Sequence, residues 1–287
     1  MIESFAESWP LFQNSYLSGW AIVYVLALIG VWVVARDQIF LGVAVAQAST
    51  LGVATALWLG GLGIGAALER LGEDAVAATL AVAASVATAL ATVLRREGGP
   101  ESAEAVTGWV FLVAASVPTL LLARDPHGLE EVHQLLFSTL LGATGLDLAI
   151  FGGLALATTV LAWRHHAPLR LLAIDPEIAP AVGLRSGWWH AALAVWLGLA
   201  VGLSIRVSGT LYTFGCLVLP ALVAKHLVRE VRTLVWLAPV IALAAAVAGF
   251  VLAHSLDTPP AHTTVAFLCA ALPLAWGVRR VRTGRWR

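Results

Sequence analysis

Residues 233–256 read TLVWLAPVIALAAAVAGFVLAHSL, and no Asp, Glu, Lys or Arg interrupts them. A helix crosses a bilayer core with roughly 20 consecutive apolar residues, so this stretch predicts a transmembrane helix. The whole chain has the same character: 60% of its 287 residues are hydrophobic and 12% are charged, against about 25% charged in soluble proteins. The mean hydropathy is +0.87. The composition therefore excludes an ordinary soluble protein and indicates a polytopic membrane protein.

Charge-free runs recur along the sequence and predict about nine transmembrane helices. They are Leu17–Ala35, Gln38–Leu68, Ala75–Leu94, Ala105–Ala123, Leu148–Trp163, Gly187–Ile205, Val207–Ala224, Thr233–Leu256 and Thr258–Val278. The run Val132–Leu146 is too short to span, and we expect an interfacial or re-entrant helix there. The expected fold is an all-α membrane helix bundle forming one transmembrane domain over residues 1–287.

The positive charges predict an orientation. If the N-terminus lies outside and nine helices follow, every Lys and Arg falls on the inner side except Arg70, Arg124 and Arg206. Cytoplasmic loops carry the excess of Lys and Arg in membrane proteins. We therefore expect an outside N-terminus, a cytoplasmic C-terminus and a multi-pass location in the inner, cytoplasmic membrane.

Several kinds of catalytic chemistry are missing from the sequence. A nucleotide-binding loop needs GxxxxGK followed by Ser or Thr, but the one lysine, Lys225, lies in LVAKHL. Neither HExxH nor GxSxG occurs, and the predicted spans lack the ionisable residues of proton- or sodium-coupled carriers. The sequence thus predicts no catalytic residues, no enzyme activity and no nucleic-acid partner. A transporter without its own energy source needs a separate ATPase, which favours the permease subunit of an ABC transporter.

A permease of that kind contacts its ATPase through a short cytoplasmic helix, and the segment at about residues 172–186 is suited to it. Asp175 is a suitable helix N-cap, Pro176 suits the first helical position, and Glu177 falls in the first turn. Gly183 is a suitable helix stop. An ordinary capped connector between two spans would show the same pattern, so the spacing alone leaves both interpretations open.

Six stretches, in order, resemble the zinc/manganese-type ABC permease family over nearly the whole chain. IDPEIAPAVGL at 174–184 is similar to its coupling segment, which assigns coupling to Asp175, Glu177, Ala179 and Gly183. IRVSGTLYTFGCLVLPALVAKHL and LAHSLDTPPAHTTVAF are similar to its late helix and last exterior loop. LFQNSYLSGWAI, FLGVAVAQASTLGVA and LLFSTLLGATGLDL are similar to its first span, the start of its second span and its partial helix. The resemblance implies an importer of zinc, manganese or iron, a second permease copy, an ABC ATPase subunit and an external metal-binding protein.

The sequence departs from this family where the family places its metal ligands. The second span there usually opens with Gly-Asp, with a His four residues after the Asp, and residues four apart share one helix face. In FLGVAVAQAST Gly42 is kept, but Val43 and Gln47 occupy the two ligand positions. Three interpretations follow: a pathway without a fixed ligand, a different substrate such as a chelated metal, or a repurposed permease-like protein.

Histidines at the last exterior loop are further candidates for handling the metal. His254, Asp257 and His262 are close in sequence and could pass a metal inward, although solvated histidines at a membrane interface would show the same spacing. We expect no cofactor bound by this chain, the metal being cargo. The alternatives of another class are an ATP-independent carrier or channel and a non-transporting membrane interaction protein.

Overall fold

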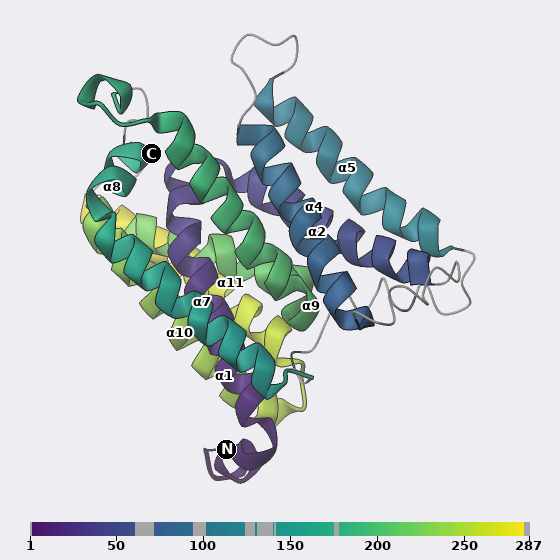
Figure 1. Ribbon diagram of the computed structural model, residues 1–287. Coiled ribbons are helices and arrows are strands. Elements are labelled where there is room, and N and C mark those ends of the chain that lie inside the picture. The colour runs from purple at the N-terminus through teal and green to yellow at the C-terminus, as the bar shows by residue number, and fades with distance from the viewer. Residues whose placement is uncertain are drawn as a thin grey trace. The chain divides into compact units, whose positions relative to one another are not determined.

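The computed structural model describes residues 2–60, 72–93, 102–123, 130, 140, 142–174 and 178–283, and every regular element in these ranges is helical. Figure 1 shows the helices with their labels. Their bounds are α1 Ile2–Ala35, α2 Ile39–Leu59, α4 Glu73–Val93, α5 Ala103–Leu122, α7 Gly145–Arg164, α8 His166–Ile174, α9 Ser186–Leu227, α10 Val231–Leu256 and α11 Pro260–Thr283, with a short 3₁₀ helix at Pro180–Val182. The all-α prediction is confirmed.

Eight of the described helices are long and apolar enough to cross a membrane. The sequence predicted nine spans, and the difference arises in α9, which contains both Gly187–Ile205 and Val207–Ala224. Gly209 inside α9 has the non-helical angles φ 72° and ψ 169°, so this element is two helices joined at a kink. The end of the predicted run Gln38–Leu68 and most of Val132–Leu146 lie outside the described residues.

The helices cluster into two compact units. Unit 1 comprises Met1–Gln38, Thr139–Leu184 and Leu211–Arg287, and unit 2 comprises Ile39–Ser138 and Arg185–Thr210. The boundary inside α9 falls directly after the Gly209 kink. Each unit therefore joins segments that are distant in sequence, and the single transmembrane domain over residues 1–287 stays a prediction.

Helix α1 is the centre of unit 1, where it packs against α7 and α10, and α10 packs against α11. Its interior residues Ile22, Leu26 and Leu28 are fully buried. Two close contacts hold the part of α9 after Gly209 against α1. The Tyr212 hydroxyl donates to the Gly19 carbonyl oxygen at 3.0 Å, and Gly30 lies directly against the Leu217 backbone, where any Cβ would clash.

Unit 2 is assembled from small residues, as is usual where transmembrane helices approach closely. Helix α2 packs against α4 and α5. Gly198 and Gly202 of α9 lie against the backbone of α4, so that a side chain at either position would clash. The Ser85 hydroxyl donates to the Gly198 carbonyl oxygen at 2.6 Å, which satisfies a polar group that lipid could not.

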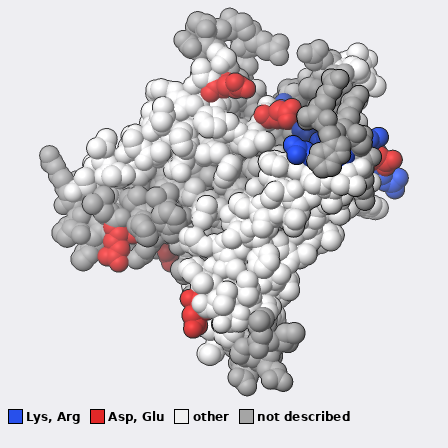
Figure 2. Space-filling view, turned by 180° about the vertical axis from the view of Figure 1, so that it is seen from behind, with Lys and Arg blue, Asp and Glu red and all other residues white. Residues whose placement is uncertain are grey.

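The basic residues of unit 1 gather at one end of its helices. Two pockets at that end are lined by the C-terminal ends of α1, α7 and α11, by α8, by the end of α9 and by the start of α10. Lys225, Arg229, Arg232, Arg170 and Arg279 are among the lining residues. We call this region the basic end. On the face shown in Figure 2, Lys and Arg gather in one area and most of the surface is free of charge.

Candidate functional site

The two family ligand positions lie on one face of α2. Val43 and Gln47 are both half-buried, whereas Gly42, Ala44, Ala46 and Ala48 are buried. An i, i+4 pair presents two side chains to the same space, so the geometry would suit two ligands of one ion. Valine has no donor atom, and an amide oxygen is a poor ligand for zinc compared with imidazole or carboxylate. The face keeps the geometry of a ligand pair without its chemistry.

Hydroxyl groups lie one helical turn further along α2, in the interior of unit 2. The hydroxyls of Thr50 and Thr210 lie 3.0 Å apart in hydrogen-bond contact, and Thr50 also donates to the Ala46 carbonyl oxygen. The Ser49 hydroxyl is buried with no hydrogen-bond partner among the described residues. Thr210 directly follows the kink at Gly209. Gln47, Ser49 and Thr50 are thus neighbouring polar residues of α2, and Thr210 of α9, distant in sequence, makes a hydrogen bond with Thr50.

The predicted coupling segment is described in part. Asp175 and Glu177 lie outside the described residues. Ala179 is buried, and Gly183 has φ +81° directly after the Pro180–Val182 turn. The Leu184 amide donates to the Ala179 carbonyl oxygen at 3.0 Å. Gly183 thus ends the turn in the left-handed conformation that favours glycine, while the coupling role of these residues stays a prediction.

The coupling segment carries three exposed apolar side chains. Ile174, Ile178 and Val182 are 69%, 50% and 64% exposed. They recur at intervals of four residues in the sequence, outside the long apolar helices, and Ile174 also lines the pocket at the basic end. Exposed large apolar residues outside a span are typical of a protein contact surface. We name Ile174, Ile178 and Val182 the apolar ridge.

Helix α8 was missed by the sequence analysis. Its buried residues Leu169, Leu172 and Ala173 recur at i, i+3 and i+4 and form the inner face of an amphipathic helix. That spacing was readable in the sequence, but nine residues are too few to stand out among long apolar runs. The helix leads directly from the end of α7 towards the coupling segment.

The candidate metal-handling residues of the last exterior loop lie at the connection between α10 and α11. His254 is in the last turn of α10, and Asp257 is its C-cap with φ 52° and ψ 40°. His262 is in the first turn of α11. Within the described part of the chain no group of three or more His, Cys, Asp or Glu side chains could hold a metal ion. The structure therefore does not assemble these three as one ligand set, and their metal role stays a prediction.

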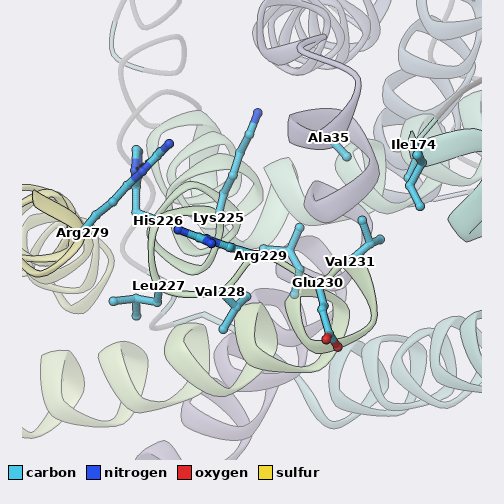
Figure 3. A pocket seen from close by; sticks show the side chains of 12 residues that line it. Ala35, Ile174, Lys225, His226, Leu227, Val228, Arg229, Glu230, Val231 and Arg279 are labelled. Atoms are coloured by element: carbon cyan, nitrogen blue, oxygen red, sulfur yellow. Dashed lines mark hydrogen bonds between the residues drawn. The ribbon is translucent and has the colours of Figure 1, made fainter. Parts of the chain in front are cut away.

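A pocket with a volume of about 570 Å³ lies at the basic end of unit 1 (Figure 3). Its charged lining residues are Lys225, Arg229, Glu230 and Arg279. Lys225 donates to a carboxylate oxygen of Asp37 at 3.1 Å and approaches the Val34 carbonyl oxygen at 3.4 Å, which places a cation at the C-terminal end of α1. Burial lowers the pKa of the adjacent Arg36, yet arginine stays charged at neutral pH.

Comparisons with known proteins extend over nearly the entire chain. The manganese import system permease protein ScaB of Streptococcus gordonii is 23% identical over 268 residues, covering 92% of this chain and 91% of that protein. The chelated iron transport system membrane protein YfeD of Yersinia pestis is 23% identical, covering 87% and 79%. Among solved structures, a chain of PsaBC from Streptococcus pneumoniae in complex with Fab matches with a TM-score of 0.80 at 19% identity, covering 96% of this chain and 95% of that one.

The family comparison spans the same region. The sequence model of the ABC 3 transport family matches residues 8–276, which include the α2 face, the coupling segment and the exterior loop. The family resemblance drawn from the sequence motifs is confirmed. This chain is a multi-pass membrane protein that belongs to the ABC 3 transport family.

Proposed function

We propose that this chain is the membrane-spanning permease subunit of an ABC importer that moves a divalent transition metal into the cell. The observation that carries the proposal is the family match over residues 8–276, together with relatives named for manganese and chelated iron transport. Zinc, manganese and iron all remain within the expected substrate class. ATP hydrolysis belongs to a separate chain, because the sequence has no nucleotide-binding loop.

The apolar ridge supports a docking role for the coupling segment. Ile174, Ile178 and Val182 expose apolar surface in the connection between α7 and α9, outside the long apolar helices. An ATPase subunit that covered them would bury this surface. We also propose the arrangement implied by the family: two permease copies in the inner membrane, an external metal-binding protein, and the basic end of unit 1 facing the cytoplasm.

Val43 and Gln47 favour a second candidate substrate, a chelated metal. A chelate brings its own ligands, so the pathway needs no Asp and His pair to coordinate the ion. The half-buried apolar and amide groups of this α2 face would suit such a cargo better than a bare cation. One of the relatives carries chelated iron in its name.

Metal accumulation in whole cells tests the proposal. Zinc, manganese and iron would be measured by elemental analysis in cells with and without the gene, under chelator limitation. A Gln47→Ala strain would be grown alongside, with a Gln13→Ala strain as its matched control, since Gln13 is an exposed glutamine of α1 and not a residue of α2. We expect deletion to lower one metal selectively. Unchanged levels of all three, with and without added chelates, would contradict metal import.

A further inference from the structure

The second pocket at the basic end, with a volume of about 250 Å³, is formed by four helices of unit 1. The end of α7, helix α8 and the start of α10 contribute to its walls together with one residue of α1. Its lining combines three tryptophans with two arginines and a histidine: Trp32, Trp163, Trp236, Arg170, Arg232 and His166. Tryptophan is enriched where a membrane meets water, so this lining suits a pocket at the level of the lipid headgroups.

Both arginines of this pocket keep donor groups that the described residues do not use. The Nε of Arg170 donates to the His166 carbonyl oxygen, one turn earlier on α8, at 3.1 Å. Its two terminal nitrogens make no hydrogen bond or ion pair with the described residues. Arg232, in the first turn of α10, is exposed and makes none with them either. Guanidinium groups bind phosphate through paired N–H donors, so these two side chains are suited to a phosphate group.

Trp32 is the buried tryptophan of the lining, with 6% of its surface exposed. Its indole nitrogen is shielded from solvent and has no hydrogen-bond partner among the described residues. An indole N–H is a donor only, and a buried donor without an acceptor costs free energy. The lining thus adds a further donor to those of the arginines, and the matching ligand is one rich in acceptor oxygens.

Two exposed apolar helix faces continue from the pocket along α7 and α10. On α7, Leu156, Val160 and Trp163 are exposed and recur at the spacing of one helix face. On α10, Trp236 and Val240 are exposed one turn apart. Because α7 ends and α10 begins at the pocket, both faces extend from it into the transmembrane part of unit 1. Such faces suit the acyl chains of a lipid, whereas a soluble anion would leave them uncovered.

We propose that this pocket binds the phosphate group of a membrane phospholipid. Phosphate oxygens accept from the guanidinium groups of Arg170 and Arg232, and the acyl chains lie along the exposed faces of α7 and α10. Basic pockets between transmembrane helices bind lipid headgroups in other membrane proteins. The proposal does not depend on which cargo the permease carries.

Thermal unfolding of the purified full-length chain in detergent micelles tests the site. Phosphatidylglycerol, diacylglycerol with the same acyl chains, and inorganic phosphate would each be titrated into the wild type, Arg232→Gln and Arg229→Gln. Arg229 is an exposed arginine that does not line this pocket, so Arg229→Gln is the matched control for loss of one positive charge. We expect phosphatidylglycerol to raise the unfolding temperature of the wild type and of Arg229→Gln. Its apparent affinity should fall about tenfold in Arg232→Gln.

Three results would overturn the proposal. Equal responses of all three proteins to phosphatidylglycerol would show that Arg232 does not bind the lipid. Equal stabilisation by diacylglycerol would assign the binding to the acyl chains without the phosphate. Equal stabilisation by inorganic phosphate would assign the pocket to a soluble anion. Arg170→Gln is the second pocket variant and should show the same loss of affinity, so it decides the question if Arg232→Gln does not fold.

Discussion

Residue 209 shows how much one backbone conformation matters in this protein. Gly209 has φ 72° and ψ 169°, a region that only glycine occupies without strain. The kink separates the part of α9 that belongs to unit 2 from the part that belongs to unit 1. It also precedes Thr210, whose hydroxyl contacts Thr50. A single residue without a side chain therefore lets the two halves of α9 contribute to different units.

Gly209→Ala should destabilise the protein by about 1–3 kcal/mol, because the Cβ makes this backbone conformation strained. The measurement is thermal unfolding in detergent. Gly187→Ala is the matched control in the same helix, since a Cβ there meets nothing within 4 Å and the backbone has no positive φ. Alanine is the better helix former, so that control should be unchanged or slightly more stable. Equal unfolding temperatures for the two variants would contradict the assigned strain.

Val43 and Gln47 permit a direct test of the lost ligand pair. The double variant Val43→Asp with Gln47→His places a carboxylate and an imidazole at i and i+4 on the α2 face. It should bind Zn²⁺ at least tenfold more tightly than the wild type, in equilibrium dialysis of the purified chain. The two single variants are the controls and should gain less. If the double variant binds no better than either single variant, the two positions do not point into a common space.

At the scale of an element, the segment between α7 and α9 is the most informative. It comprises the amphipathic helix α8 and the Pro180–Val182 turn, which ends at Gly183. The buried face of α8 holds it on unit 1, and the apolar ridge remains exposed. A segment that is anchored on one face and apolar on the other suits a contact with another chain.

Val182→Ser should weaken association with the ATPase subunit about tenfold, because it removes most of the apolar surface of one ridge residue. The measurement is the amount of ATPase that co-purifies with the permease. Val281→Ser is the matched control: Val281 is also exposed, it lies near the end of α11, and it is not part of the ridge. Loss of ATPase in both variants, or in neither, would argue against docking at the ridge.

At the scale of the whole molecule, the sidedness of charge is the governing property. Within unit 1, the described Lys and Arg residues lie at or beyond the helix ends that meet at the basic end, and the long apolar bodies of α1, α7, α10 and α11 carry none. A charge placed within the bilayer core would cost several kcal/mol. The separation of the Lys and Arg residues from the apolar helix bodies is therefore expected for a protein that spans a membrane.

Cysteine labelling should establish the direction of insertion. In a background of Cys216→Ala and Cys269→Ala, Ser255→Cys near the end of α10 should react with a membrane-impermeant maleimide added to intact spheroplasts. Arg280→Cys at the basic end should react only after the membrane is permeabilised. Both native residues are exposed. The reverse pattern would place the basic end outside and contradict the predicted orientation.

The sequence by itself determined the fold class, the positions of nearly all spans and the family. Runs such as Thr233–Leu256 can be recognised because the bilayer demands length and apolarity from each helix separately, a property of local composition. The coupling turn and its stop at Gly183 were likewise readable, because glycine is favoured where φ is positive. The family motif alone was enough to show that Val43 and Gln47 stand at the two positions of its metal ligands.

Only the tertiary structure decided what depends on contacts between distant residues. No local pattern pairs Thr50 with Thr210, presses Gly30 onto Leu217, or puts His226 between Trp276 and Arg279. The assignment of the two halves of α9 to different units is of the same kind, because the break at Arg206 separates two spans in the sequence but does not specify the helices against which each half packs. Apolar composition specifies that a helix lies in the membrane, whereas its neighbours are selected by close packing of small residues and by satisfaction of buried polar groups.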